Sequence, residues 1–289
     1  MSATTQILQY CSESAHTAQA FLWIFASKFK YMKRGFIALF CCFSVGLFAQ
    51  GPVSGFLPGA GKTDIAVTYA YEHFSKYFFG AQKQEISQTM HTASIFLEHG
   101  LSAKSSVIVA APYLWIGENR GLQDGSLFLK FKSYYKEDVN GNLSIVGAVG
   151  ATFPISQYST EVSNPIGARA TLLQGRVVAQ YNSVFGVFAH LQSGLDVRVS
   201  PNNLYALPVV FRIGYGGSWF YADAWLEYYH TFNAGADVSV TGGSGSTWLR
   251  GGGTLYYPVT DRFGAFLGFA QIFSGRNIGL SSRWNLGLV

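Results

Sequence analysis

The sequence predicts an all-β fold, a single antiparallel transmembrane β-barrel of about twelve strands of the kind found in the bacterial outer membrane. From Asp64 onward, apolar and polar residues alternate with a two-residue period in successive segments of about ten residues. Charged residues make up 12% of the chain, against about 25% in an ordinary soluble domain. Because strand side chains alternate between two faces, such a segment offers one face to lipid and one to a wet interior.

The alternation is clearest from Trp219 to His230, where Asp223 and Glu227 share one face and Leu226 lies on the other. A soluble β-sandwich, with an apolar core and a wet outer face, would give the same pattern and is the alternative. Aromatic residues near the segment ends suit a membrane interface and favour the barrel. They are Tyr69, Tyr71, Trp115, Tyr135, Trp219, Tyr228, Tyr229, Tyr257 and Trp284.

Twelve segments show this alternation, and single-chain bacterial barrels have an even number of strands. The predicted strands are Asp64–Phe74, Thr89–His99, Ser105–Leu114, Ser126–Lys136, Leu143–Phe153, Arg169–Asn182, Phe185–Val197, Tyr205–Tyr215, Trp219–His230, Ser246–Tyr257, Arg262–Ile272 and Asn277–Val289. Asn140-Gly141 is a typical tight-hairpin sequence between two of them. Longer polar stretches predict loops on the opposite rim: Gly80–Gln88, Gly117–Gly125, Gln157–Gly167 and Ala234–Gly245.

The N-terminal residues predict an export signal. A short basic start at Met32 is followed by the apolar run Phe36–Phe48 and by small residues, the pattern of a secretory signal peptide over residues 32–50. Residues 1–31 are then interpreted as a non-native or disordered N-terminal extension, and 51–289 as the barrel. A membrane anchor over Phe21–Phe48 is the alternative. All three cysteines precede Gly51, so no disulfide framework is expected in the barrel.

Several charged residues are predicted to line the barrel interior, because arginine on the lipid face at mid-bilayer costs about 2–4 kcal/mol. The candidates for tuning selectivity are Lys130, Arg176, Arg212, Asp223, Glu227 and Arg250. Arg283 and Lys132 are placed on the same face, and Glu98 is a further acidic partner. Of the histidines, His99 and His190 are candidates to face the lumen, although a structural role is favoured for both. Twelve strands lie between small packed barrels and wide aqueous channels, so a narrow or partly plugged pore is expected.

Other site classes find little support. Gly59–Thr63 resembles part of a phosphate loop, but Phe56 stands where that motif needs glycine. The segment is therefore interpreted as a flexible lead-in to the first strand. The histidines show no metal-ligand spacing, and the basic excess is concentrated before Gln50 rather than in a nucleic-acid groove. No catalytic, cofactor-binding or metal residue is predicted.

Some sequence motifs resemble a known family. They include Glu98–Ser102, Ala111-Pro112-Tyr113, Gly121–Gly125 and Thr152-Phe153-Pro154, after a tyrosine-rich first strand. The chain from Gly51 to Val289 resembles the outer-membrane β-barrel proteins of the meta-pathway of phenol degradation family. The resemblance implies a barrel in the outer membrane, with some members associated with the uptake of aromatic compounds, and it implies no catalytic residue.

These features predict an exported outer-membrane channel or transporter for small, hydrophobic or aromatic compounds, acting by passive passage and without enzymatic activity or cofactor. The expected partners are outer-membrane lipid, the outer-membrane assembly machinery and a small-molecule substrate, with no nucleic acid. Two alternatives remain: a structural or adhesive barrel without transport, and an outer-membrane barrel hydrolase. The sequence does not place a nucleophile and a base together for the latter.

Overall fold

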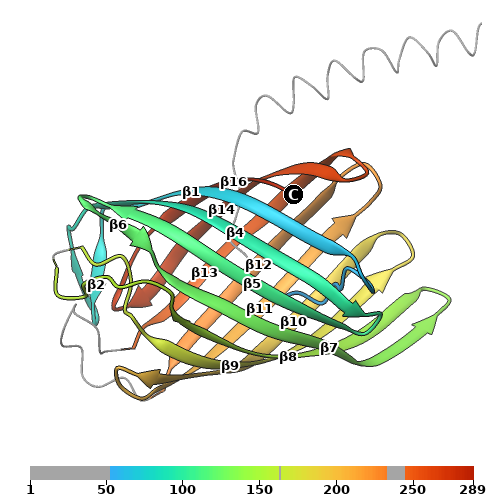
Figure 1. Ribbon diagram of the computed structural model, residues 1–289, viewed down its shortest axis with the longest axis horizontal. Coiled ribbons are helices and arrows are strands. Elements are labelled where there is room, and N and C mark those ends of the chain that lie inside the picture. The colour runs from blue at the N-terminus through green and yellow to red at the C-terminus, as the bar shows by residue number, and fades with distance from the viewer. Residues whose placement is uncertain (1–52, 163, 233–244) are drawn as a thin grey trace, which may run out of the picture. The chain divides into compact units, whose positions relative to one another are not determined.

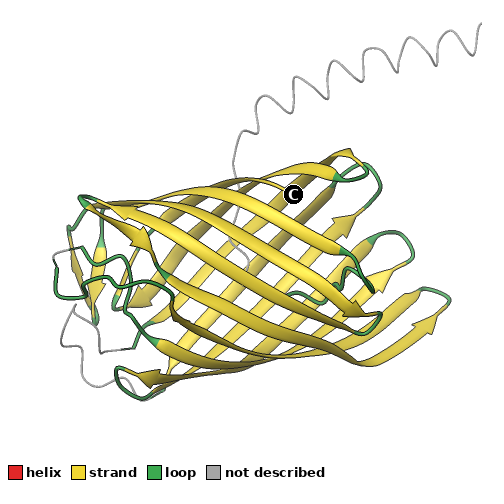
Figure 2. Cartoon of the chain, viewed as in Figure 1, coloured by secondary structure: helices red, strands yellow, loops and turns green. Residues whose placement is uncertain are grey.

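Twelve long antiparallel strands form a closed barrel in the computed structural model, which describes residues 53–162, 164–232 and 245–289 (Figures 1 and 2). The described residues all belong to one compact unit. The long strands are β1 (Thr63–Phe74), β4 (Gln88–Ser102), β5 (Ser105–Ile116), β7 (Asp124–Asp138), β8 (Gly141–Pro154), β9 (Thr171–Ser183), β10 (Val187–Ser200), β11 (Leu204–Gly216), β12 (Tyr221–Thr231), β13 (Thr247–Thr260), β14 (Phe263–Arg276) and β16 (Ser282–Leu288). The predicted extension, signal peptide and cysteines lie outside the described residues.

The barrel closes between the first and last strands. β1 pairs with β4 on one side and with β16 on the other, with Val67 opposite Leu288 and Tyr71 opposite Trp284. Every neighbouring pair of long strands is antiparallel. Closure leaves no long strand with an unpaired edge, which a sheet in lipid requires. The predicted fold class is confirmed.

All twelve predicted strands are present, and most of their boundaries lie within three residues of the observed ones; β14 continues to Arg276 rather than ending at Ile272, and two strand starts have a clear backbone cause. β9 begins at Thr171 rather than Arg169, because Arg169 has φ +46° and ends the preceding loop. The last strand begins at Ser282 rather than Asn277, whose φ of +52° turns the chain away from β14. Residues Ile278–Gly279 (β15) instead pair with β2 (Tyr77–Phe79), which pairs with β3 (Gln82–Gln84) in a small separate sheet.

The connections sort onto two rims. Tight turns follow β4, β7, β9, β11 and β13 at one end, and the Asp138 carboxylate accepts hydrogen bonds from the backbone of Asn140 and Gly141 in one of them. The longer connections follow β1, β5, β8 and β12 at the other end, where β2 and β6 (Asn119–Leu122) lie in Figure 1. This distribution is the one expected for an outer-membrane barrel, with loops facing outward and turns facing the periplasm.

The outer surface of the barrel wall is apolar. Leu191 and Phe211 lie opposite each other on β10 and β11 and are 53% and 50% exposed, whereas the adjacent Arg212 is 2% exposed. On the other strands, too, large exposed hydrophobic residues alternate with buried residues, many of which are polar or charged. Such an exterior suits lipid, and the polar residues turn toward the interior.

None of the described residues forms a helix of the length and hydropathy that a membrane-crossing helix requires.

Candidate functional site

Five of the ion pairs among the described residues lie in the barrel interior, four of them between adjacent strands and one across β5. They are Lys130–Glu98 (2.8 Å), Arg176–Asp196 (2.6 Å), Arg212–Asp223 (3.6 Å), Arg250–Glu227 (2.7 Å) and Arg283–Glu72 (3.2 Å). All six residues singled out from the sequence take part. Each pair is formally neutral, so the five together add no net charge to the lumen.

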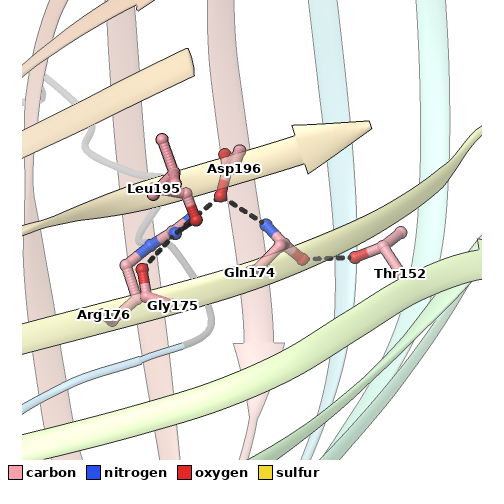
Figure 3. Close-up of polar contacts among 6 residues, drawn as sticks. All are labelled: Thr152, Gln174, Gly175, Arg176, Leu195 and Asp196. Carbon is pink, nitrogen blue, oxygen red and sulfur yellow. Dashed lines mark hydrogen bonds and ion pairs between the residues drawn. The ribbon is translucent and has the colours of Figure 1, made fainter. Parts of the chain in front are cut away.

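The Arg176 pair lies within a polar network across β8, β9 and β10 (Figure 3). The Arg176 guanidinium donates to the Gly175 carbonyl as well as pairing with Asp196. Gln174 donates to the same Asp196 carboxylate and accepts from Thr152. Because Asp196 is contacted from two directions, its charge is compensated although it is only 5% exposed.

A second group of charges lines β11, β12 and β13. The Tyr221 hydroxyl donates to the Asp223 carboxylate at 2.6 Å, beside Arg212. Farther toward the long-loop rim, Arg250 pairs with Glu227 and lies 5.7 Å from the centre of the Trp225 ring. Aromatic rings and ion pairs therefore share this wall.

Some of these partners were missed by sequence reasoning. Asp196 and Glu72 were not predicted as partners, although each lies on the inward-facing positions of its strand. The two-residue period of the strand is a signal that could have found them. Which acid meets which base depends on strand register, and register is set by pairing between distant segments.

Two other sequence expectations need correction. His99 lies on the outer face of β4, where its ring bonds Thr63, because it has the opposite parity to the inward Glu98. Tyr229 was grouped with the interfacial rings, yet it faces the lumen and stacks on Trp248 with ring centres 4.1 Å apart. The other candidate histidine, His190, lies inside the barrel as expected and is 1% exposed.

The N-terminal segment 53–62 occupies the tight-turn half of the barrel, so it is more than a flexible lead-in. Val53 is 1% exposed and packs with Ile108, Phe128 and Val178 on the inner wall. The Phe56 ring contacts Phe188 on β10 at 5.2 Å. An apolar cluster thus fills part of the lumen, as expected for a partly plugged pore.

Polar contacts hold this segment in place. The Lys130 ammonium donates to the Phe56 carbonyl at 2.6 Å while it pairs with Glu98, and Ser106 donates to the same carboxylate oxygen. Near the rim, Gly61 donates to the Gly100 carbonyl and Gly100 donates to Lys62. The segment is therefore fastened to both β4 and β7.

A cavity of about 280 Å³ remains in the long-loop half. Its lining residues come from β9 to β13, from the start of β7 and from the end of the β8–β9 loop. They combine aliphatic, aromatic and charged side chains and include Leu172, Asp196, Arg198, Leu204, Tyr229 and Trp248, together with Gln123, Asp124, Ala168 and Ala170. The cavity adjoins the Arg176–Asp196 pair and is the candidate functional site.

Two solved structures share this fold. The COG4313 outer membrane channel from Pseudomonas putida F1 matches with a TM-score of 0.64 and 14% identity, over 83% of this chain and 98% of that one. The NanC porin matches with a TM-score of 0.52 and 10% identity, over 78% of this chain and 98% of that one. At these identities the likeness shows the fold alone.

No family model matches the chain, and no curated protein matches it. The resemblance to the meta-pathway of phenol degradation family therefore stays a prediction.

Proposed function

We propose that the protein is an outer-membrane channel through which small, hydrophobic or aromatic compounds pass without energy coupling. The observation that carries this proposal is the combination of an apolar exterior with an interior lined by neutral ion pairs and containing a cavity. Ten of the interior charges cancel within these five pairs, which weakens the field that ions meet and favours neutral solutes over charged ones.

The substrate class is supported by the cavity walls. The stacked Tyr229 and Trp248 rings and the Leu172 and Leu204 side chains offer apolar and aromatic surface beside polar groups. Ligand pockets commonly combine such a surface with a few polar groups that fix orientation. The names of the two similar structures, an outer membrane channel and a porin, agree with passage of small molecules.

Location and partners belong to the same proposal. The exposed apolar band would contact outer-membrane lipid, and a closed barrel of this kind would need the assembly machinery of that membrane. Residues 32–50 would direct export.

The test is a transport measurement on the purified full-length protein. Planar-bilayer conductance and liposome swelling with neutral solutes, including single-ring aromatic compounds, should both show passage. Entry of neutral aromatics should be faster than entry of charged solutes of equal size. No conductance and no swelling, with correctly folded protein, would contradict the proposal.

A barrel without transport is the second candidate, and the N-terminal segment favours it, since Val53 and Phe56 fill part of the lumen. In that case the liposomes would not swell even after the segment is displaced. Liposome swelling with a variant whose N-terminal segment is loosened therefore distinguishes the two candidates.

Arg212 tests the electrostatic part of the proposal. Arg212→Gln leaves Asp223 without its 3.6 Å partner, so the lumen gains negative charge and the reversal potential in a salt gradient should shift toward cation preference. The double variant Arg212→Gln/Asp223→Asn should return it to the parent value. Unchanged conductance and reversal potential in the single variant would remove Arg212 from the residues that influence permeation.

A further inference from the structure

We infer that the β8–β9 loop, in its described residues 155–162 and 164–170, sets the size limit of the barrel at its long-loop mouth, and that Ile166 and Tyr158 are the residues that hold it there. The inference rests on the proposed channel function, because a size limit matters only where solutes pass. It assigns the restriction to an element that the sequence predicted only as a surface loop.

An apolar anchor holds the loop against the inner wall. Ile166 is 3% exposed and packs with Leu114 and Ile116, which occupy the inward-facing positions of β5. Met90 on β4 packs against the same cluster. A Cβ at Gly121 on β6 would lie 3.1 Å from the Ile166 side chain, so β6 packs closely against Ile166 as well. A loop anchored on the inner face lies across the mouth instead of projecting from the rim.

Polar anchors fix the two ends of the loop. The Tyr158 hydroxyl donates to the Asp124 carboxylate at the start of β7 and accepts from the Arg169 backbone amide at 2.8 Å. Burial, together with the bond to Asp124, raises the pKa of Tyr158, so the phenol stays protonated and keeps donating. One tyrosine therefore ties the start of the loop to its end and to the barrel wall.

The middle of the loop has a third attachment. Gln88 on β4 donates to the Asn164 side chain at 2.8 Å, and Asn119 donates to the Asn164 carbonyl at 3.0 Å. The two contacting residues are 31 positions apart in sequence and lie on different strands, and both bind Asn164. The loop is thus fastened along its length and behaves as part of the wall.

The loop forms one side of the cavity. Ala168 and Ala170, at its end, line the same 280 Å³ space as Tyr229 and Trp248. In the inferred arrangement, a solute entering from this rim passes between the loop and these aromatic rings. Releasing the loop should enlarge the opening without changing the β9–β13 side, so the accepted solute size should rise.

Thiol labelling can test the mouth independently of transport. The three natural cysteines all precede Gly51, so replacing them with serine leaves Ala206→Cys as the single thiol, on the β11 wall of the cavity. Labelling rates of folded full-length protein are compared for a small methanethiosulfonate and a bulky polyethylene-glycol maleimide. The double variant Tyr158→Phe/Ile166→Ser should raise the rate of the bulky reagent several-fold and leave the small one nearly unchanged.

A matched control loses similar groups at the opposite rim. Tyr135 also donates to a carboxylate, that of Glu137, and Val184 lies in a tight turn and is 62% exposed. Tyr135→Phe/Val184→Ser should leave both labelling rates at the parent values. If the double variant does not fold, Tyr158→Phe alone is tested instead. It should also raise the labelling rate of the bulky reagent, but by less.

The possible outcomes test the role of the β8–β9 loop separately from the proposed channel function. An unchanged ratio of bulky to small reagent in a folded loop variant, or an equal rise in the control, would overturn the inference. A raised ratio together with absent conductance and swelling would support the loop as the element that restricts access to the barrel, and it would contradict the channel proposal. A raised ratio with a higher swelling cutoff for neutral sugars would support both.

Discussion

At the scale of single residues, Lys130 shows how a charge is kept inside this barrel. Its side chain is 0% exposed, and its ammonium has two oxygen partners, one on Glu98 and one on the Phe56 backbone. Taking an ammonium and a carboxylate out of water is costly unless their hydrogen-bonding capacity is met, and here Ser106 supplies a further donor to Glu98. The residue therefore joins wall stability to the position of the N-terminal segment.

Lys130→Met should destabilise the barrel by about 3–5 kcal/mol, because it leaves the Glu98 carboxylate buried without its partner. The free energy of unfolding would be measured by urea titration in lipid vesicles. The double variant Lys130→Met/Glu98→Gln should recover much of the loss, since no uncompensated charge remains. Equal losses in the two variants would show that the charge pair is not the cause.

At the scale of elements, the N-terminal segment reaches the lumen through glycines. Gly59 and Gly61 have φ values of +89° and +71°, a region that favours glycine, and they let the chain reverse from the interior into β1. Gly100 on β4 makes the close approach possible, because a Cβ there would lie 1.8 Å from the Gly59 carbonyl oxygen. The glycines that resembled a phosphate loop thus have a steric role.

Gly100→Ala should displace residues 59–62 from β4 and loosen the segment, at an overpacking cost of about 1–3 kcal/mol. Limited proteolysis followed by mass spectrometry should detect faster cleavage before residue 63, and conductance should rise. Gly175→Ala is the matched control, since its added Cβ would meet nothing within 4 Å. Protection of the segment equal to that of the parent would argue against steric docking at Gly100.

The elements differ in how far sequence could predict them. Strands such as β11 and β12 were predictable because a two-residue period records, within each strand, which side faces lipid. The inward position of Arg212 follows from the same period, whereas its pairing with Asp223 was only one of several possible partnerships. Segment 53–62 and the β8–β9 loop have no period. The position of the segment depends on Lys130 and Gly100, and that of the loop on the packing of Ile166 against Leu114, all far away in sequence from the element they hold.

At the scale of the whole barrel, stability and location depend on the same exterior surface. In water, side chains such as Leu191 and Phe211, each about half exposed, would form a large apolar patch, which soluble monomers avoid. In a bilayer the same side chains are in their preferred solvent, and the strands are held by backbone pairing around a closed circle. The cost of a charge on this surface should therefore depend on depth along the barrel.

Leu191→Arg and Leu101→Arg test that dependence, because the two leucines are 53% and 55% exposed and differ mainly in position. Leu191 lies mid-strand opposite Phe211 and Ala179, while Leu101 is next to the tight turn after β4. Arginine should cost about 2–4 kcal/mol at the first site and about 0–1 kcal/mol at the second, measured by unfolding in vesicles. Equal and small costs at both sites would mean that water, rather than lipid, covers this face, and a soluble barrel would then be the better description.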